Sequence, residues 1–167
     1  MSRALLVIDI QNDYFARGVL PLQQALEVEA RVVEAIAQAR KAGDRIVLVQ
    51  HVSAAATGLF AAGGEGSAIR PAIKAAAGDA PVVTKRFADA FQETDLAAHL
   101  DGVTSLLVCG MMTQNCVAFT AMSRAADEFD VSIIADLCAA PIEVVHAIAL
   151  SALRSKLQVL NAAEVWP

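Results

Sequence analysis

The chain has 167 residues, of which 56% are hydrophobic and 19% are charged, and its formal net charge is −5. This composition predicts one compact domain over residues 1–167 and excludes a disordered chain. The acidic balance argues against nucleic acid as a partner. The apolar runs fall short of the roughly 20 residues that a membrane helix needs, which argues against a membrane protein.

Cysteine usage and the N-terminus point to a compartment. Three cysteines at wide spacing form neither a disulfide framework nor a zinc pattern. The first three residues run directly into an apolar segment, so no signal peptide is visible. A reducing cytoplasm is therefore the expected location.

Short apolar segments alternate with helical patterns along the whole chain. The expected strands are residues 4–8, 45–49, 82–84, 105–109, 131–135 and 157–160. The expected helices are a first one that ends near Gly43, and then residues 69–77, 94–100, 117–129 and 143–155. This alternation predicts an α/β fold with three α/β/α layers around a mostly parallel, Rossmann-like, six-stranded sheet.

Three polar side chains lie at the expected carboxyl ends of strands. Asp9 follows the first strand, Lys85 ends the third, and Cys116 follows the fourth. Because binding groups of parallel sheets collect at this edge, we expect the three side chains to converge. A carboxylate, an ammonium and a thiol together can activate a nucleophile, with Asp9 as the base and Lys85 favouring the thiolate.

Cys116 also stands where an alanine-rich stretch is expected to begin a helix. The free N–H groups and the positive dipole end of a helix N-terminus stabilise a thiolate. The same N–H groups can hold an oxyanion during attack on a carbonyl. Cys109 lies within an apolar strand and is expected to be a packing residue. For Cys138, packing is the favoured role, and a functional role is left open.

Three separated motifs carry a family resemblance. They are residues 8–15 (IDIQNDYF), residues 85–87 (KRF) with 90–91 (AF) and 94–96 (TDL), and residues 110–113 (GMMT) with 116–117 (CV). In this order they resemble the isochorismatase-like cysteine hydrolases, a superfamily that includes nicotinamidases and N-carbamoylsarcosine amidases. The resemblance covers nearly the whole chain and specifies the superfamily, though not a substrate.

The resemblance implies roles for individual residues. Asp9, Lys85 and Cys116 match the superfamily's catalytic triad. A non-proline cis peptide is implied before the nucleophile, here between Met111 and Met112. It would aim the Met112 N–H, together with that of Cys116, at the substrate oxyanion. A homo-oligomer, a dimer or larger, is also implied.

The chain departs from nicotinamidases at the expected metal site. Those enzymes carry an Asp-x-His signature after the second strand, where this chain has Gln50-His51-Val52. We therefore expect no metal and no other cofactor, and a substrate other than nicotinamide. His99 and His146 are expected in helices away from the strand ends.

Further residues near the expected site are candidates for contact with a small-molecule substrate. They are Gln11, Phe15, His51, Phe87 and Phe91. Asp136 ends the expected fifth strand, and either a structural or a functional role is open for it. The glycine-rich loop over residues 53–66 is a candidate lid, subunit contact or mobile loop.

The expected activity is metal-independent hydrolysis of a small amide- or ester-like substrate through a thioester acyl-enzyme. A retained cysteine favours this reaction over cleavage of a vinyl ether with Asp9 as the acid, which does not need the thiol. A binding or redox-responsive protein with the same fold is the other alternative, since a thiolate is also an oxidation site.

Overall fold

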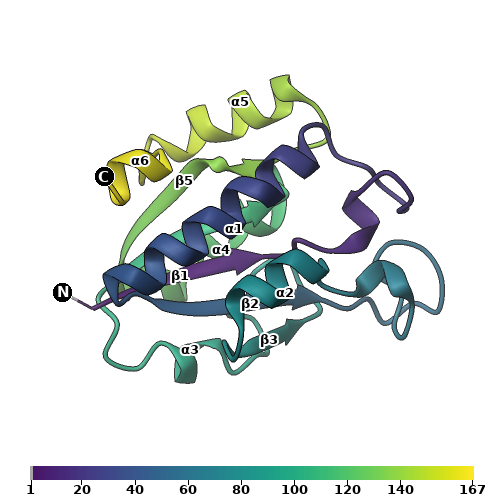
Figure 1. The fold of residues 1–167 in the computed structure, drawn as a ribbon, viewed down its shortest axis with the longest axis horizontal. Coiled ribbons are helices and arrows are strands. Elements are labelled where there is room, and N and C mark those ends of the chain that lie inside the picture. The colour runs from purple at the N-terminus through teal and green to yellow at the C-terminus, as the bar shows by residue number, and fades with distance from the viewer. Residues whose placement is uncertain (1) are drawn as a thin grey trace.

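The computed structural model describes residues 2–167, and it confirms the α/β architecture. A six-stranded sheet has the order β3-β2-β1-β4-β5-β6, and every neighbouring pair is parallel (Figure 1). The strands are β1 (Arg3–Ile8), β2 (Arg45–His51), β3 (Val82–Lys85), β4 (Ser105–Met111), β5 (Asp130–Ala139) and β6 (Gln158–Leu160).

Helices cover both faces of this sheet. They are α1 (Ala25–Ala42), α2 (Pro71–Ala77), α3 (Leu96–His99), α4 (Ala118–Ala121), α5 (Glu143–Leu153) and α6 (Ala162–Val165). In Figure 1, α1 and α2 lie in front of the strands and α4 lies behind them. Within residues 2–167, the structure contains no helix with the length and apolar character that crossing a bilayer requires.

The strand order places a crevice between β1 and β4. From β1 the chain proceeds outward through β2 to β3, whereas from β4 it proceeds in the other direction through β5 to β6. Connections on the two sides of β1 and β4 therefore diverge at the carboxyl ends of these strands. In parallel sheets this switch point is where ligands bind.

Helix α1 forms where the apolar period changes from strand-like to helical. Val28, Val32, Ile36 and Ala39 recur at helical spacing and are buried against the sheet. Gly43 ends the helix with a φ of 80°, and its N–H bonds to the carbonyls of the last turn. A left-handed residue at this point is the common device for ending a helix, and glycine adopts it at least cost.

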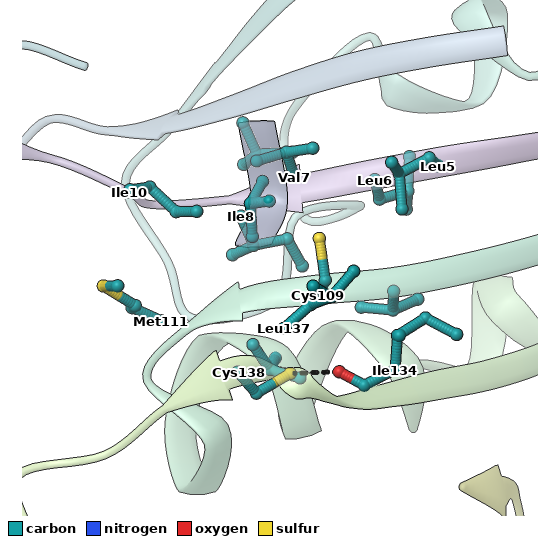
Figure 2. Packing of buried hydrophobic residues seen from close by; sticks show 14 of the residues in the cluster. Leu5, Leu6, Val7, Ile8, Ile10, Cys109, Met111, Ile134, Leu137 and Cys138 are labelled. Carbon is teal, nitrogen blue, oxygen red and sulfur yellow. Dashed lines mark hydrogen bonds between the residues drawn. The ribbon is translucent and has the colours of Figure 1, made fainter. Parts of the chain in front are cut away.

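The core runs along β1, β4 and β5 (Figure 2). All seven residues of β4 are buried, which is the pattern of a central parallel strand. Cys109 and Cys138 are buried in this core, and the Cys138 thiol donates a hydrogen bond to the Ile134 carbonyl at 3.3 Å. Both cysteines are packing residues, as predicted.

Two predicted elements were wrong in extent. The expected helix over residues 117–129 is broken at Ser123, whose hydroxyl caps a separate 3₁₀ turn, Arg124–Glu128. The expected fifth strand stops at residue 135, but β5 continues to Ala139 through a bulge in its pairing with β4. Asp136 therefore lies inside β5, where its carboxylate accepts the Ala162 N–H at 2.9 Å.

Candidate active site

Four polar side chains from four segments meet at the carboxyl edge of the sheet. Asp9 follows β1, His51 ends β2, Lys85 ends β3, and Cys116 lies in the π-helical turn Thr113–Val117 after β4. Asp9 leaves β1 with a φ of 51°, and its N–H still bonds to Val49 of β2 at 3.0 Å. The sheet therefore determines where each of these side chains starts.

The Lys85 ammonium lies at the centre of the cluster. Its Nζ is 2.8 Å from Asp9 Oδ2, 2.9 Å from His51 Nδ1, 3.0 Å from the Phe87 carbonyl oxygen and 3.2 Å from Cys116 Sγ. The side chains of Lys85 and Asp9 are both fully buried. Two buried charges are tolerated only when they are paired, so each of these side chains depends on the other to remain charged in the interior. The predicted convergence of Asp9, Lys85 and Cys116 is confirmed.

Asp9 keeps free accepting capacity next to the sulfur. Within residues 2–167, its Oδ1 atom is buried and has no hydrogen-bond partner. The ligand atoms of Asp9, His51 and Cys116 all lie within 4.8 Å of one another. A carboxylate oxygen in this position can take a proton from the thiol or from a bound substrate.

The surroundings of Cys116 favour the protonated thiol. Burial, followed by the negative charge of Asp9, raises its pKa well above the ordinary value, and Lys85 offsets only part of that rise. The stabilisation of a thiolate by Lys85 and by the helix N-terminus is therefore smaller than the effect of burial. The pKa is raised because Cys116 lies within the first helical turn and is almost entirely shielded from water, which disfavours the charged form. A thiol of this kind needs a base at the moment of attack.

Asp9, His51 and Cys116 offer the donor types that bind zinc. A metal ion shared by these three atoms would have to lie among them. The Lys85 ammonium already lies within 3.2 Å of Cys116 Sγ, 2.9 Å of His51 Nδ1 and 2.8 Å of Asp9 Oδ2. A second cation there would meet a buried positive charge at close range, so the donor set does not fit a metal ion.

His51 is held from behind by Gln11. The Gln11 side-chain amide donates to the His51 carbonyl at 2.8 Å and accepts the His51 N–H at 2.8 Å. Its second N–H donates to the Ser67 carbonyl at 2.6 Å. Gln11 is fully buried and both of its N–H donors are used within the protein. Gln11 therefore links the end of β1 to β2 and to the following loop, and its contact with substrate stays a prediction.

The glycine-rich loop folds over the cluster and delivers Phe60. The Phe60 ring packs edge-on against Tyr14, with ring centres 4.9 Å apart, and tilts against His51 at 5.5 Å. Only 2% of Phe60 is exposed. Burial, together with the nearby charges of Asp9 and Cys116, raises the pKa of Tyr14, which places this hydroxyl beside the site. Tyr14 and Phe60 were not among the predicted contacts, because no local pattern marks a loop residue that becomes buried.

The other predicted aromatic contacts have different surroundings. The Phe15 ring carries the Arg70 guanidinium at 4.1 Å, and Phe91 stacks on Phe129 with ring centres 6.3 Å apart. Neither contact involves the cluster, and substrate binding by these two rings stays a prediction. Phe87 is 38% exposed and lines a hollow of about 410 Å³ with Val52, Ser53, Ala54, Ala62, Thr84, Arg86 and Glu93.

The segment before Cys116 is held by a contact that the sequence did not reveal. The peptide bond between Met111 and Met112 is cis, at the position that the resemblance implied. Thr113 is fully buried, and its hydroxyl lies 2.8 Å from His146 Nδ1 on α5. His146 was expected to lie away from the strand ends. Instead it contacts the residue that opens the turn of Cys116.

The cluster itself is enclosed. Asp9, Lys85 and Cys116 are each at most 2% exposed. A larger hollow of about 670 Å³ lies beside Asn12, Arg17 and Arg70, and another of about 430 Å³ lies between α1 and α5. Neither is lined by a member of the cluster, so hollow size alone does not identify the site. The chemistry of the buried cluster is the stronger criterion.

The chain is similar to known proteins over nearly its whole length. Residues 3–164 match the isochorismatase domain family. The uncharacterized isochorismatase family protein YddQ of Bacillus subtilis is 29% identical over 99% of both chains. The structure of an isochorismatase family protein from Desulfovibrio vulgaris superposes with a TM-score of 0.89 at 26% identity, covering 98% of this chain and 96% of that one. For nicotinamidase from Bacillus subtilis the TM-score is 0.84 at 26% identity, covering 96% of this chain and all of the other. The chain therefore belongs to the isochorismatase family of hydrolases.

Proposed function

We propose that this protein is a cysteine hydrolase that cleaves a small amide- or ester-like substrate through Cys116, Asp9 and Lys85. The observation that carries the proposal is the position of the buried Lys85 ammonium, 2.8 Å from Asp9 Oδ2 and 3.2 Å from Cys116 Sγ. An acid–base group and a nucleophile that share one buried cation form a unit for nucleophilic catalysis. The similarity to nicotinamidase supports an amide as the substrate class.

In the first half of the reaction, Asp9 removes the proton from the Cys116 thiol. The sulfur attacks the substrate carbonyl, a C–S bond forms, and the carbonyl oxygen becomes an oxyanion. The backbone N–H groups of Met112 and Cys116 would stabilise this oxyanion. When the intermediate collapses, the C–N or C–O bond breaks and protonated Asp9 gives its proton to the leaving group.

In the second half, water replaces the leaving group. Asp9 takes a proton from water as its oxygen attacks the thioester carbon. The C–S bond then breaks, the carboxylic acid leaves, and Cys116 recovers a proton from Asp9. Because the raised pKa of Cys116 keeps the free enzyme in the thiol form, Asp9 is needed in both halves.

We propose that the reaction proceeds without a metal ion. Lys85 supplies the positive charge that stabilises the developing thiolate, from a position among the atoms that a metal would need. The enclosure of the cluster by Tyr14 and Phe60 favours a small substrate. His51 contacts Lys85 through its ring and Phe87 through its backbone carbonyl, so both residues lie beside the site that we propose for the substrate.

The decisive experiment incubates the purified protein with a panel of small carboxamides and esters and measures ammonia or acid release. For any substrate that is hydrolysed, Cys116→Ala should abolish turnover, and mass spectrometry should detect an acyl adduct on the Cys116 peptide of the unmodified protein. Asp9→Asn should lower kcat by about 10²- to 10⁴-fold, which is the usual contribution of a general acid–base group.

Cys138→Ala is the matched control, because Cys138 is also a buried thiol but donates its proton to a backbone carbonyl in the core. It should keep the activity of the unmodified protein. Turnover by Cys116→Ala at the unmodified rate would reject covalent catalysis and favour an acid-catalysed cleavage by Asp9.

We also propose that the chain forms a homo-oligomer and acts in the cytoplasm. Helices α4 and α5, with Met122 directly after α4, expose large apolar side chains, namely Phe119, Met122, Val144 and Ile148. Light scattering coupled to gel filtration would measure the mass of the assembly. All three cysteines are free thiols in the structure, which agrees with a reducing compartment.

A further inference from the structure

The three protons of the Lys85 ammonium all have partners. An ammonium group donates three hydrogen bonds. The Lys85 Nζ makes hydrogen bonds to His51 Nδ1 at 2.9 Å, to the Phe87 carbonyl at 3.0 Å and to Cys116 Sγ at 3.2 Å. Asp9 Oδ2 lies 2.8 Å from Nζ as an ion-pair partner, but within residues 2–167 neither Asp9 oxygen accepts a hydrogen bond. The third Lys85 proton is therefore directed at the sulfur.

Two of these three acceptors do not change during the proposed reaction. The Phe87 carbonyl and the His51 imidazole keep the same charge throughout, whereas Cys116 changes from thiol to thiolate. A hydrogen bond to an ionised acceptor is stronger than one to a neutral acceptor, so the bond from Lys85 to the sulfur strengthens as attack begins.

We infer that His51 is a positioning residue for Lys85. Together with the Phe87 carbonyl, it accepts two of the three ammonium protons throughout the cycle, so that the third stays directed at Cys116 Sγ. The Nζ atom then needs no movement to stabilise the thiolate, and without His51 the ammonium can turn toward Asp9 instead. This inference rests on the proposed triad and assigns His51 a role on Lys85 in place of the predicted contact with substrate.

The surroundings of His51 keep it in the required form. Nδ1 can accept a proton from Lys85 only if the ring is neutral and carries its own proton on Nε2. Burial, and then the positive charge of Lys85, lower the pKa of His51, against the opposing effect of Asp9. The Phe60 ring covers one side of the imidazole, and Gln11 holds its backbone through both polar groups.

A first test uses the unmodified protein. Long-range ¹H–¹⁵N correlation spectra of histidine-labelled protein distinguish the two neutral tautomers and the charged form. The chain has three histidines, so His99→Asn and His146→Asn assign the signals by difference. We expect His51 to be neutral at pH 7, with its proton on Nε2. A proton on Nδ1 would make this nitrogen a donor and would overturn the inference.

A second test measures how Cys116 reacts with iodoacetamide as a function of pH. The sulfur forms a bond to the methylene carbon, iodide leaves, and the thiol proton passes to Asp9 and then to solvent. Peptide mass spectrometry identifies the alkylated cysteine. Because the Cys116 pKa is raised well above its ordinary value, the rate between about pH 6 and 9 is proportional to the small fraction of thiolate. The comparison of two variants at the same position removes the effect of how easily the reagent enters.

Two variants separate positioning from packing. In His51→Asn the side-chain oxygen can replace Nδ1 as an acceptor, whereas His51→Leu has similar bulk and no acceptor. We expect His51→Leu to lower the alkylation rate about tenfold at each pH between about 6 and 9, equivalent to a rise of about one unit in the pKa of the thiol. His51→Asn should remain near the unmodified profile of rate against pH. His99→Asn, at an exposed ion pair with Asp95, is the control that should change nothing.

Each outcome of these experiments either supports or overturns the positioning role of His51. An unmodified profile in His51→Leu, or an equal shift in His51→Asn and His51→Leu, would overturn the positioning role. If His51→Leu fails to fold, the rate profile of His51→Asn and the tautomer of the His51 ring still test the positioning role. Because alkylation needs no turnover, the predicted profiles in a protein that hydrolyses no amide or ester would leave the positioning role intact and reject the proposed function alone.

Discussion

The Asp13 carboxylate accepts a 2.6 Å hydrogen bond from the backbone N–H of Phe60, a residue 47 positions later in the chain. The same carboxylate accepts the Val19 N–H at 3.2 Å. A Cβ atom on Gly66 would overlap Asp13, so the loop passes directly against this carboxylate. Asp13 therefore joins the two loops that enclose the cluster, and Phe60 depends on it for its position over His51.

Removal of the Asp13 carboxylate should loosen the loop over residues 53–66. Asp13→Ala leaves two backbone donors without this partner, which should lower the free energy of unfolding by about 1–3 kcal/mol. Hydrogen exchange should become faster at Phe60 and in the rest of the loop, while β1 stays protected. Asp79→Ala, at a fully exposed carboxylate, is the control. Unchanged exchange in Asp13→Ala would show that the loop is held by its apolar contacts instead.

The ion pair of Asp9 and Lys85 should be costly to break on one side only. Lys85→Met leaves the Asp9 carboxylate buried and unpaired, and we expect a loss of about 3–5 kcal/mol in the free energy of unfolding. The double variant Asp9→Asn, Lys85→Met removes that charge and should recover much of the loss. Urea unfolding of Lys85→Met, Asp9→Asn and the double variant, each compared with the unmodified protein, measures the loss and its recovery. Additive losses in the double variant would mean that the two groups do not depend on each other.

Gly110 should resist replacement by alanine. It has a φ of 121°, and a Cβ there would overlap the backbone of Ile8 on the neighbouring strand β1. We expect Gly110→Ala to destabilise the protein by more than the roughly 1–3 kcal/mol of backbone strain alone. Because Ile8 precedes Asp9, residual activity should fall as well. Gly102→Ala has a positive φ but open space around it, and the difference between the two variants isolates the overlap.

Stability should fall at alkaline pH because buried thiols resist ionisation. Burial raises the pKa of Cys138 from 9.0 to about 12. Between these values the folded chain holds the Cys138 proton and the unfolded chain loses it, so the unfolded state is favoured as pH rises. This thiol should contribute a loss of about 1.4 kcal/mol per pH unit within that window and none below it. Urea unfolding of the unmodified protein and Cys138→Ala at pH 7, 9 and 10 should give a steeper decline for the unmodified protein. Parallel declines would assign the effect to other groups.

The sheet and the central triad were predictable because they depend on local patterns. Buried parallel strands appear as continuous apolar runs, and their carboxyl ends meet at one edge regardless of the details of packing. Asp9, Lys85 and Cys116 could therefore be grouped before their distances were known. Ser123 shows where this approach fails, since one capping side chain divides an alanine-rich stretch that otherwise has a helical composition.

The residues around the triad depend on contacts between distant segments. Gln11 and His51 were both taken for substrate contacts, because a polar side chain after a strand has the same appearance whether it binds a ligand or a neighbouring backbone. Only the folded structure shows that the Gln11 side-chain amide is hydrogen-bonded to the backbone of His51 and Ser67. His146 is a similar case, since its contact with Thr113 joins residues 33 positions apart.

By itself, the sequence determined the α/β fold, the family and the convergence of Asp9, Lys85 and Cys116, because periodicity, strand ends and motif order are properties of short segments. The tertiary structure decided the protonation of Cys116, the place of Lys85 among its four partners, and the enclosure by Tyr14 and Phe60. The physical reason is that pKa values and hydrogen-bond choices depend on burial and on distances between charges, which arise only when separate segments pack together.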